Sequence, residues 1–174
     1  LSGSRAPGSH SGALAASDVA VDALFRQCGI IRAETLDDML AIAAGFSAQS
    51  LPSGRRVGII TNAGGPAILC TDACEASGLI VPELSAQTKK DLEAFLPSTA
   101  ARSNPVDLIA SATLEQYANA ISTVLAADEI DALIILYVSV TVVDTAGIAE
   151  GVTRGIEKGR GKASKRKPIL IAWL

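Results

Sequence analysis

Short apolar runs alternate with longer amphipathic segments along most of the chain. Val57–Thr61, Ala132–Val138 and Ile169–Trp173 are almost wholly apolar, which is typical of strands that are buried on both faces. Between these runs, apolar residues recur at helical spacing, and several segments begin at a residue that caps helices well. Strands that alternate with helices in this way predict an α/β protein with a parallel sheet between helical layers.

The elements expected from this pattern fall into two groups. A turn-rich linker at Ser47–Gly54 separates two early helices from the remaining elements. We therefore expect the C-terminal part of one α/β subdomain in residues 1–50 and a flavodoxin-like three-layer subdomain in residues 51–174, truncated at its C-terminal end. The expected helices are Asp18–Gln27, Thr35–Phe46, Pro66–Ser77, Ala86–Phe95, Thr113–Ala127 and Thr145–Lys158, and the expected strands are Val57–Thr61, Leu79–Val81, Ala132–Val138 and Ile169–Trp173, with Asn104–Leu108 extended.

Composition narrows the class of protein. Hydrophobic residues make up 49% of the chain and charged residues 19%, which is enough apolar material for a core and excludes a disordered chain. The net charge of −3 and the aromatic content of 3% argue against a nucleic-acid-binding surface. No apolar run approaches the roughly 20 residues of a membrane helix. Cys28, Cys70 and Cys74 share the chain with one histidine, too few ligands for a zinc site, so we expect reduced thiols in a cytoplasmic protein.

A glycine turn between an expected strand and an expected helix is the first candidate site. Residues 62–66 read Asn-Ala-Gly-Gly-Pro, and backbone N–H groups at a helix start attract anions that glycine allows to approach closely. Asn62, Gly64 and Gly65 are therefore candidates for binding a phosphate or a carboxylate. The turn has neither the Walker A nor the full dinucleotide fingerprint, and a tight turn whose glycines serve geometry alone is the alternative.

Three other segments carry candidate residues. Asn104 and Asp107 lie in an extended stretch, where Asp107 either accepts a hydrogen bond from a substrate or closes an Asx turn on its own backbone. Ser139, Thr141 and Asp144 follow an apolar strand, and capping of the next helix is the simpler interpretation. Because the chain is acidic overall, we interpret a basic tract as a solvated loop rather than a nucleic-acid site; its members are Lys158, Arg160, Lys162, Lys165, Arg166 and Lys167.

His10 is the candidate nucleophile. It lies in the sequence Pro-Gly-Ser-His-Ser-Gly, which indicates an exposed imidazole on a loop. An ordinary histidine pKa near ~6.5 leaves the ring largely neutral at cytosolic pH, so it can act as a nucleophile. A surface histidine without a function and a remnant of an affinity tag are the alternatives, since Gly-Ser-His is common in such remnants.

Four separated motifs, in order, resemble the NDP-forming acyl-CoA synthetases, which include the ADP-forming acetyl-CoA synthetases and are related to succinyl-CoA synthetase. Gly3–Asp18, with its Ser-His-Ser-Gly-Ala-Leu core, is similar to the phosphohistidine loop of that family. The resemblance continues through Phe25–Arg32, Val57–Asp72 and Asn104–Leu108. Two positions depart from the family pattern: Ser11 replaces the commoner Thr, and Ala67 replaces a frequent Gly.

The resemblance implies a function for the whole protein. Members of the family interconvert acyl-CoA, ADP and phosphate with the acid, CoA and ATP. His10 matches the phosphoryl carrier, and Asn62, Gly64 and Gly65 match a loop close to the phosphohistidine. The parent protein is expected to use CoA, ADP or ATP and Mg. Its CoA-binding Rossmann domain and ATP-grasp domain would lie outside this chain or on another subunit, so we expect the chain alone to be inactive and leave room for a homo-oligomer.

Two other functions compete with this interpretation. Similar domains occur as non-catalytic regulatory regions of lysine acetyltransferases, in which the histidine is often lost; the retained His10 argues against this class. The full-length sequence would discriminate, because it carries either an acetyltransferase or an ATP-grasp domain. A stand-alone flavodoxin-like binding module is the third candidate, but no hydroxyl-rich phosphate loop follows the first parallel strand.

Overall fold

The computed structural model describes residues 18–139 and 145–174. His10, Thr141 and Asp144 lie outside the described residues. The chain divides into two compact units, Leu1–Ala48 and Gln49–Leu174. In the first unit the described elements are α1 (Asp18–Cys28) and α2 (Leu36–Ala48), neither of which has a buried residue. Arg32 follows α1 and forms ion pairs with Asp18 and Asp22 of that helix, at 2.8 and 2.6 Å.

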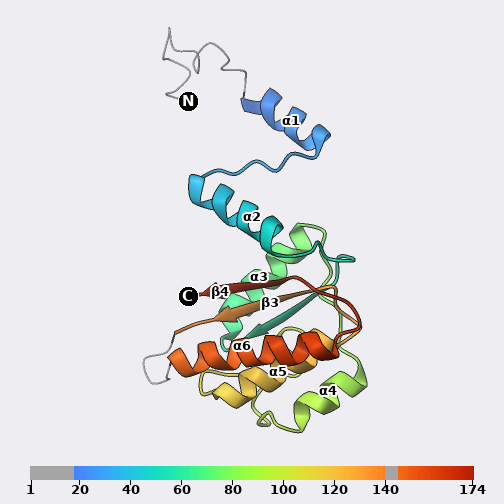
Figure 1. Ribbon diagram of the computed structural model, residues 1–174, viewed down its shortest axis with the longest axis vertical. Helices are drawn as coiled ribbons and strands as arrows, with labels where there is room; N and C mark the ends of the chain where they lie inside the picture. Colours follow the sequence, from blue (N-terminus) through green and yellow to red (C-terminus); the bar gives the residue numbers. More distant parts are fainter. Residues whose placement is uncertain (1–17, 140–144) are drawn as a thin grey trace. The chain divides into compact units, whose positions relative to one another are not determined.

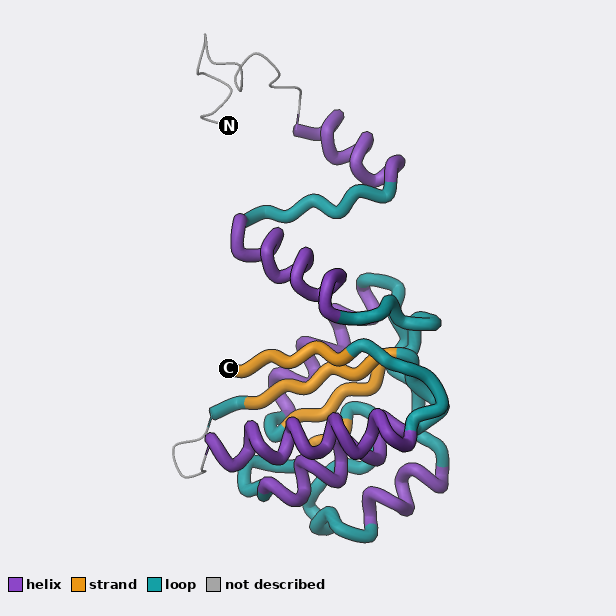
Figure 2. Tube along the Cα trace, in the orientation of Figure 1, coloured by secondary structure: helices purple, strands orange, loops and turns teal. Residues whose placement is uncertain are grey.

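The second unit is built on a parallel sheet with strand order β2-β1-β3-β4. Its strands are β1 (Val57–Thr61), β2 (Val106–Asp107), β3 (Ala132–Tyr137) and β4 (Ile169–Trp173). The helices α3 (Gly64–Ala76), α4 (Ala86–Glu93), α5 (Leu114–Ala126) and α6 (Thr145–Lys162) connect or follow them. Figure 1 labels the helices and the strands β3 and β4, and Figure 2 shows the strands side by side. The predicted parallel α/β architecture is confirmed.

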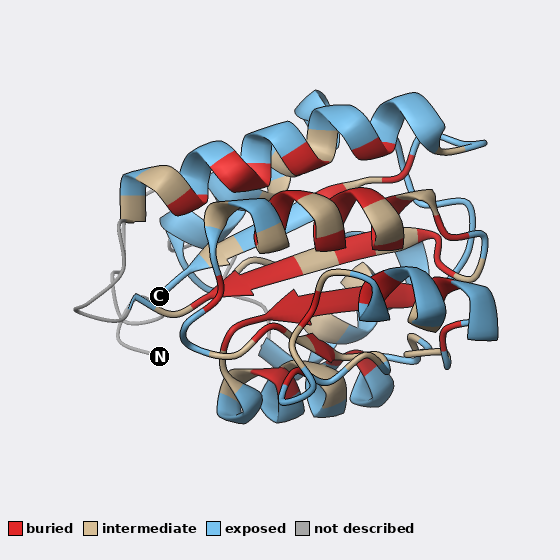
Figure 3. Cartoon of the chain, turned by 90° about the horizontal axis from the view of Figure 1, so that it is seen from below, coloured by how far each residue is buried: buried red, intermediate tan, exposed pale blue. Residues whose placement is uncertain are grey.

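Side chains alternate between two apolar clusters on the two faces of the sheet. Ile60, Leu133 and Ile135 pack with the buried residues of α5 and α6 in the larger cluster. On the opposite face, Ile59 packs with Cys74 of α3. The strands β1 and β3 between these layers are largely buried (Figure 3), which explains why their sequences are apolar at almost every position. The burial predicted for both faces of β4 is wrong, because Leu170, Ile171 and Trp173 of this edge strand are exposed.

Three glycines of α6 bring that helix against α5. A Cβ on Gly151 would lie 2.6 Å from the carbonyl oxygen of Leu114, and a Cβ on Gly155 would lie 2.8 Å from that of Ala118. A Cβ on Gly159 would lie 3.0 Å from Leu125. The missing side chains therefore set how closely the two helices approach, and the glycines are needed for packing although they weaken an isolated helix.

The predicted strand Leu79–Val81 is wrong. Only Ile80 pairs, in one isolated bridge to Arg56. Beyond that bridge, the side chain of Asn104 occupies the edge of β1: its Oδ1 accepts a hydrogen bond from Ile59 N at 2.9 Å, and its Nδ2 donates to Val57 O at 2.8 Å. A side chain thus replaces a strand residue in the ladder.

Most helix boundaries follow the predicted caps. Ser85 accepts from Thr88 N at the start of α4, and Thr113 and Gln116 form the expected capping box of α5. Several boundaries differ from the predictions. α3 begins at Gly64, two residues before the predicted Pro66, and the ends of α2 and α4 each differ by two residues. The largest difference is in α6, which continues to Lys162, into the basic tract predicted to be a loop.

Glu129 gives the second unit an acid-sensitive contact, and a pH series tests it. Its Oε1 accepts hydrogen bonds from Ser85 N at 2.6 Å and Thr88 Oγ1 at 3.0 Å. Partial burial raises the pKa of Glu129, but the hydrogen bonds from Ser85 and Thr88 outweigh that effect and lower the pKa from 4.5 to about 2. Because the folded pKa is lowered, this contribution to stability is present above pH 4.5 and is lost as the pH falls towards about 2.

We expect Glu129→Gln to flatten the fall in unfolding temperature between pH 4.5 and about 2, as followed by circular dichroism. Glu157→Gln is the matched control, because Glu157 is exposed and its carboxylate accepts no hydrogen bond among the described residues. Curves of equal slope for the wild type and Glu129→Gln would show that the contact contributes no acid sensitivity.

Candidate functional site

The candidate site lies beyond the carboxyl ends of the neighbouring strands β1 and β3. The chain runs from β1 to β2 on one side and then returns to place β3 on the other side of β1. In open parallel sheets, such a reversal leaves a crevice beyond the strand ends where ligands bind. The segments that leave these ends begin at Asn62 after β1, at Leu108 after β2 and at Val138 after β3.

Asn62 joins the ends of β1 and β3. It is 4% exposed, its Nδ2 donates to Val138 O, and its Oδ1 accepts from Val138 N, both at 2.9 Å. The side-chain amide is therefore committed to the backbone of a segment 76 residues away. The geometry makes Asn62 a residue that positions the two strand ends.

The N-terminus of α3 has no side-chain cap. Its N-cap residue, Ala63, makes no side-chain hydrogen bond to the helix, and the first turn contains no acidic residue. Ala63 N donates to Thr61 Oγ1 at 3.1 Å, and Pro66 has no N–H. The N–H groups of Gly64 and Gly65 therefore have no acceptor within the described structure, and both residues are exposed.

This helix end differs from those of α4 and α5, which Ser85 and Thr113 cap. Two free N–H groups and the positive end of a helix dipole favour an anion. Among the described residues, no atom lies within 4 Å of the position that a Cβ on Gly65 would occupy, so they leave the front of this turn open. The arrangement is suited to a phosphate or carboxylate group.

Asp107 stands beside the same turn. Its Oδ1 accepts from Ile109 N at 2.9 Å, which is the Asx turn that the sequence left as an alternative. Its Oδ2 lies 3.5 Å from the position that a Cβ on Gly64 would occupy. Ile109 adopts a φ of 64°, a left-handed conformation that is strained for a β-branched residue. The Asp107 carboxylate thus lies beside the place where an anion would bind. It can accept a hydrogen bond from an N–H or O–H group of the same ligand.

The structure separates the predicted site residues into two groups. Gly64, Gly65 and Asp107 come together at the first turn of α3. Asn104 lies elsewhere: its side chain binds the backbone of β1 and also donates a hydrogen bond to Pro82 O at 3.0 Å. Thr61, which holds the turn through Ala63, was missed by the sequence argument. A threonine that ends an apolar strand just before a glycine turn is the signal that would have identified it.

Two buried tyrosines behind this edge also escaped the sequence argument. Tyr137 ends β3, and its ring lies 4.3 Å from Trp173 and 6.1 Å from Tyr117, measured between centroids. Neither tyrosine hydroxyl has a hydrogen-bond partner in the described part of the chain. Burial raises the pKa of Tyr117, with smaller contributions from Tyr137 and Asp107.

Two features are absent from residues 18–139 and 145–174. Within them, no three His, Cys, Asp or Glu side chains lie close enough together to hold a metal ion. None of the helices described there combines the length and apolarity needed to cross a bilayer.

Comparison with known proteins finds two domain families that match this chain. Residues 57–173 match the Ligase-CoA domain, and residues 1–46 match the succinyl-CoA ligase like flavodoxin domain. The chain is 40% identical over 175 residues to the alpha subunit of acetate–CoA ligase [ADP-forming] II of Pyrococcus furiosus, covering 99% of this chain and 37% of that protein. It is 38% identical over 123 residues to 4-hydroxybutyrate–CoA ligase [ADP-forming] of Nitrosopumilus maritimus, covering 71% of this chain and 18% of that protein.

Solved structures agree with the sequence relatives. The chain superposes on dinucleotide forming acetyl-coenzyme A synthetase 1 of Ca. Korarchaeum cryptofilum, in complex with phosphate and ADP, with a TM-score of 0.81 and 26% identity. That match covers 94% of this chain and 34% of the other. The chain thus spans at most 37% of each of these relatives.

Proposed function

The chain belongs to the Ligase-CoA domain family, and from this premise we propose that it is part of an NDP-forming acid–CoA ligase. The reaction of the whole protein is acyl-CoA + ADP + phosphate = acid + CoA + ATP. Relatives named as ADP-forming acetate– and 4-hydroxybutyrate–CoA ligases support this assignment. They give no support to a regulatory domain of a lysine acetyltransferase.

The uncapped first turn of α3 is the observation that carries the proposal. The reaction moves an anionic phosphoryl group, and Gly64 and Gly65 offer two free N–H donors at a helix end without a competing carboxylate in its first turn. Such donors stabilise negative charge without reorganising during the reaction. In the proposed function, this turn therefore holds the phosphoryl group or the substrate carboxylate.

Asn62, Asp107 and His10 have distinct proposed roles. Asn62 keeps the strand ends in place through Val138, and Asp107 accepts a hydrogen bond from a protonated group that accompanies the phosphoryl group. His10 is the proposed phosphoryl carrier: its ring nitrogen attacks the phosphorus of an acyl phosphate, the acid leaves, and ADP later takes the phosphoryl group. Asn104 has no part in this chemistry, because its amide is bound to the β1 backbone.

The remaining components of the reaction belong to the longer parent protein. We assign CoA binding to a Rossmann domain, and ADP and Mg binding to an ATP-grasp domain, either in the same polypeptide or on another subunit. The alpha-subunit naming of one relative supports a division between subunits. The free thiols Cys28, Cys70 and Cys74 are in keeping with a cytoplasmic parent.

Titration of the ¹⁵N-labelled chain with inorganic phosphate tests the proposed anion position. We expect saturable shifts of the Gly64 and Gly65 amide signals. The N-terminus of α5 is an internal control, because Thr113 and Gln116 already satisfy its donors. Equal responses at both helix ends, or none at α3, would contradict the proposed role of this turn.

A further inference from the structure

The basic tract near the end of the chain is not used by the proposed reaction. Six of the ten residues from 158 to 167 are Lys or Arg, and none is acidic. The end of α6 carries Arg160 and Lys162, and the connection to β4 carries Lys165, Arg166 and Lys167. This connection precedes the amino end of β4, whereas Asn62 follows the carboxyl end of β1. Because the sheet is parallel, the tract lies at the opposite edge from the candidate site.

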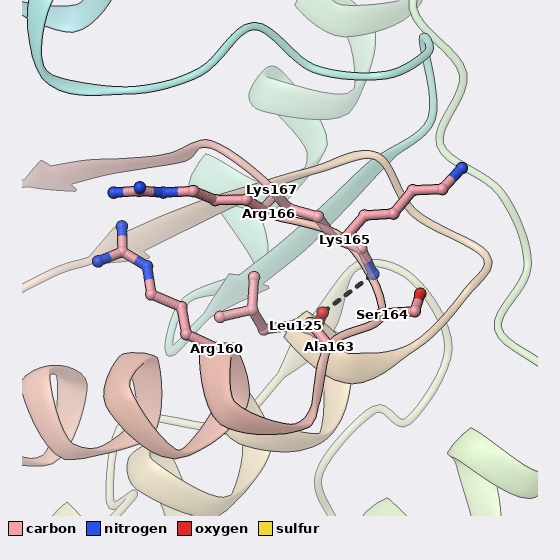
Figure 4. Close-up of a pocket in the computed structure, with 7 residues that line it drawn as sticks. All are labelled: Leu125, Arg160, Ala163, Ser164, Lys165, Arg166 and Lys167. Atoms are coloured by element: carbon pink, nitrogen blue, oxygen red, sulfur yellow. Dashed lines mark hydrogen bonds between the residues drawn. The ribbon is translucent and has the colours of Figure 1, made fainter.

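Part of the tract encloses a pocket of about 270 Å³, lined by Leu125, Arg160, Ala163, Ser164, Lys165, Arg166 and Lys167. Figure 4 shows the side chains of Arg160 and Arg166 extending to the same side of the pocket, whereas Lys165 points away from them. Both arginines line this pocket, and in this view their guanidinium groups end on the same side.

Lys167, rather than Arg160 or Arg166, binds the carbonyl groups at the end of α5. It is 5% exposed, and its Nζ donates to Leu125 O at 2.9 Å and also to Ala127 O. These carbonyl groups lie at the C-terminal end of α5, so Lys167 satisfies the acceptors that a helix end usually leaves to neighbouring cations. The dashed line in Figure 4 marks its bond to Leu125.

The neighbouring carboxylates are already bound by other groups. The acidic residues whose charges act on Lys167 are Asp128, Asp131 and Glu129. Ser164 Oγ donates to Asp128, Arg56 donates to both oxygens of Asp131, and Ser85 and Thr88 bind Glu129. Arg160 and Arg166 consequently have no ion pair and no side-chain hydrogen bond within the described residues, and both are exposed.

We propose that Arg160 and Arg166 form a clamp for a diphosphate group, at a site separate from the α3 turn. A guanidinium group binds two oxygens of one phosphoryl group through a planar fork. Two such groups that line one pocket match two linked phosphoryl groups, and the pocket of about 270 Å³ has room for a ligand of that size. The ligand is inorganic pyrophosphate or the diphosphate of a nucleotide, since both present the same chemistry.

The test is a titration of the full ¹⁵N-labelled chain with inorganic pyrophosphate, phosphate and ADP at physiological salt. We expect pyrophosphate to shift the amides of residues 160–167 and to bind at least about tenfold more tightly than phosphate. Similar affinities for pyrophosphate and ADP would show that the diphosphate alone is bound, and tighter binding of ADP would identify a nucleotide ligand. No shift at these residues, or equal binding of phosphate and pyrophosphate, would overturn the clamp.

Variants separate a fork from a general charge effect. We expect the double variant Arg160→Ala/Arg166→Ala to weaken pyrophosphate binding at least about tenfold, and Arg160→Lys/Arg166→Lys to recover only part of it. Arg55→Ala is the matched control, because Arg55 is an exposed arginine outside the tract. Full recovery of pyrophosphate binding in the lysine variant, or an equal loss of binding in Arg55→Ala, would show that the attraction is only a general charge effect. The amide signals of Gly64 and Gly65 report anion binding at the α3 turn separately. A negative result at one of the two sites therefore does not decide the result at the other.

Discussion

Gly65→Asp in the intact parent protein is expected to slow phosphoryl transfer by about a hundredfold or more while the chain stays folded. A Cβ on Gly65 would meet nothing within 4 Å, so the fold has room for the new side chain. A carboxylate in the first turn interacts favourably with the helix dipole and adds roughly 0.3–1 kcal/mol of stability. The same carboxylate occupies the position proposed for the phosphoryl group and repels it. Stability and transfer should therefore change in opposite directions.

Gly65→Asn is the matched control for this prediction. Asparagine has nearly the size of aspartate without the charge, so it reports the effect of volume alone. Thermal unfolding measures stability, and transfer of label from ATP to the parent measures phosphoryl transfer. Full transfer in Gly65→Asp, or equal losses in the Asp and Asn variants, would show that the charge of this helix end does not act on the reacting group.

Gly155→Ala is expected to lower the free energy of unfolding of the second unit by about 1–3 kcal/mol. The new Cβ would lie 2.8 Å from Ala118 O and 2.9 Å from Ile121 Cβ. Ala118 O belongs to the backbone of α5, so the two helices must move apart and loosen the apolar cluster around Ile121 and Val152. This cost exceeds the gain in helix propensity from replacing glycine, which is about 1 kcal/mol.

Gly161→Ala is the control on the same helix, because a Cβ there would meet nothing within 4 Å. We expect it to leave stability unchanged or to raise it slightly. Urea unfolding followed by circular dichroism gives both values. Equal effects of the two substitutions would mean that the close approach of α5 and α6 does not depend on the absence of a side chain at Gly155.

Local chemistry explains why much of the fold could be predicted. The strand Val57–Thr61 is confirmed at both ends, because burial on two faces requires apolar residues throughout. The strand Ile169–Trp173 is also confirmed at both ends, although three of its five residues are exposed. The cap of α5 at Thr113 is confirmed, since a capping box is a contact between residues three apart. Signals of this kind lie within one element and are visible without knowledge of the fold.

Contacts between distant segments explain what sequence reasoning missed. The Asn104 side chain replaces a strand residue beside β1, so an apolar stretch at Ile80 forms only one bridge. Asn62 looked like a ligand-binding residue in a glycine turn, yet its amide binds Val138. α6 includes Gly159, and this glycine lies in the close contact with Leu125 of α5 instead of ending the helix. None of these partners is close in sequence, so no local pattern could indicate them.

Labelling of the intact parent protein tests the central claim most directly. The wild type and His10→Ala would be incubated with labelled ATP and Mg²⁺, and the labelled residue would be mapped. The proposed function predicts an acid-labile, base-stable phosphoryl group on His10 that is absent from His10→Ala and is discharged by ADP. A wild-type protein that binds nucleotide but never carries label on His10 would contradict the phosphohistidine mechanism.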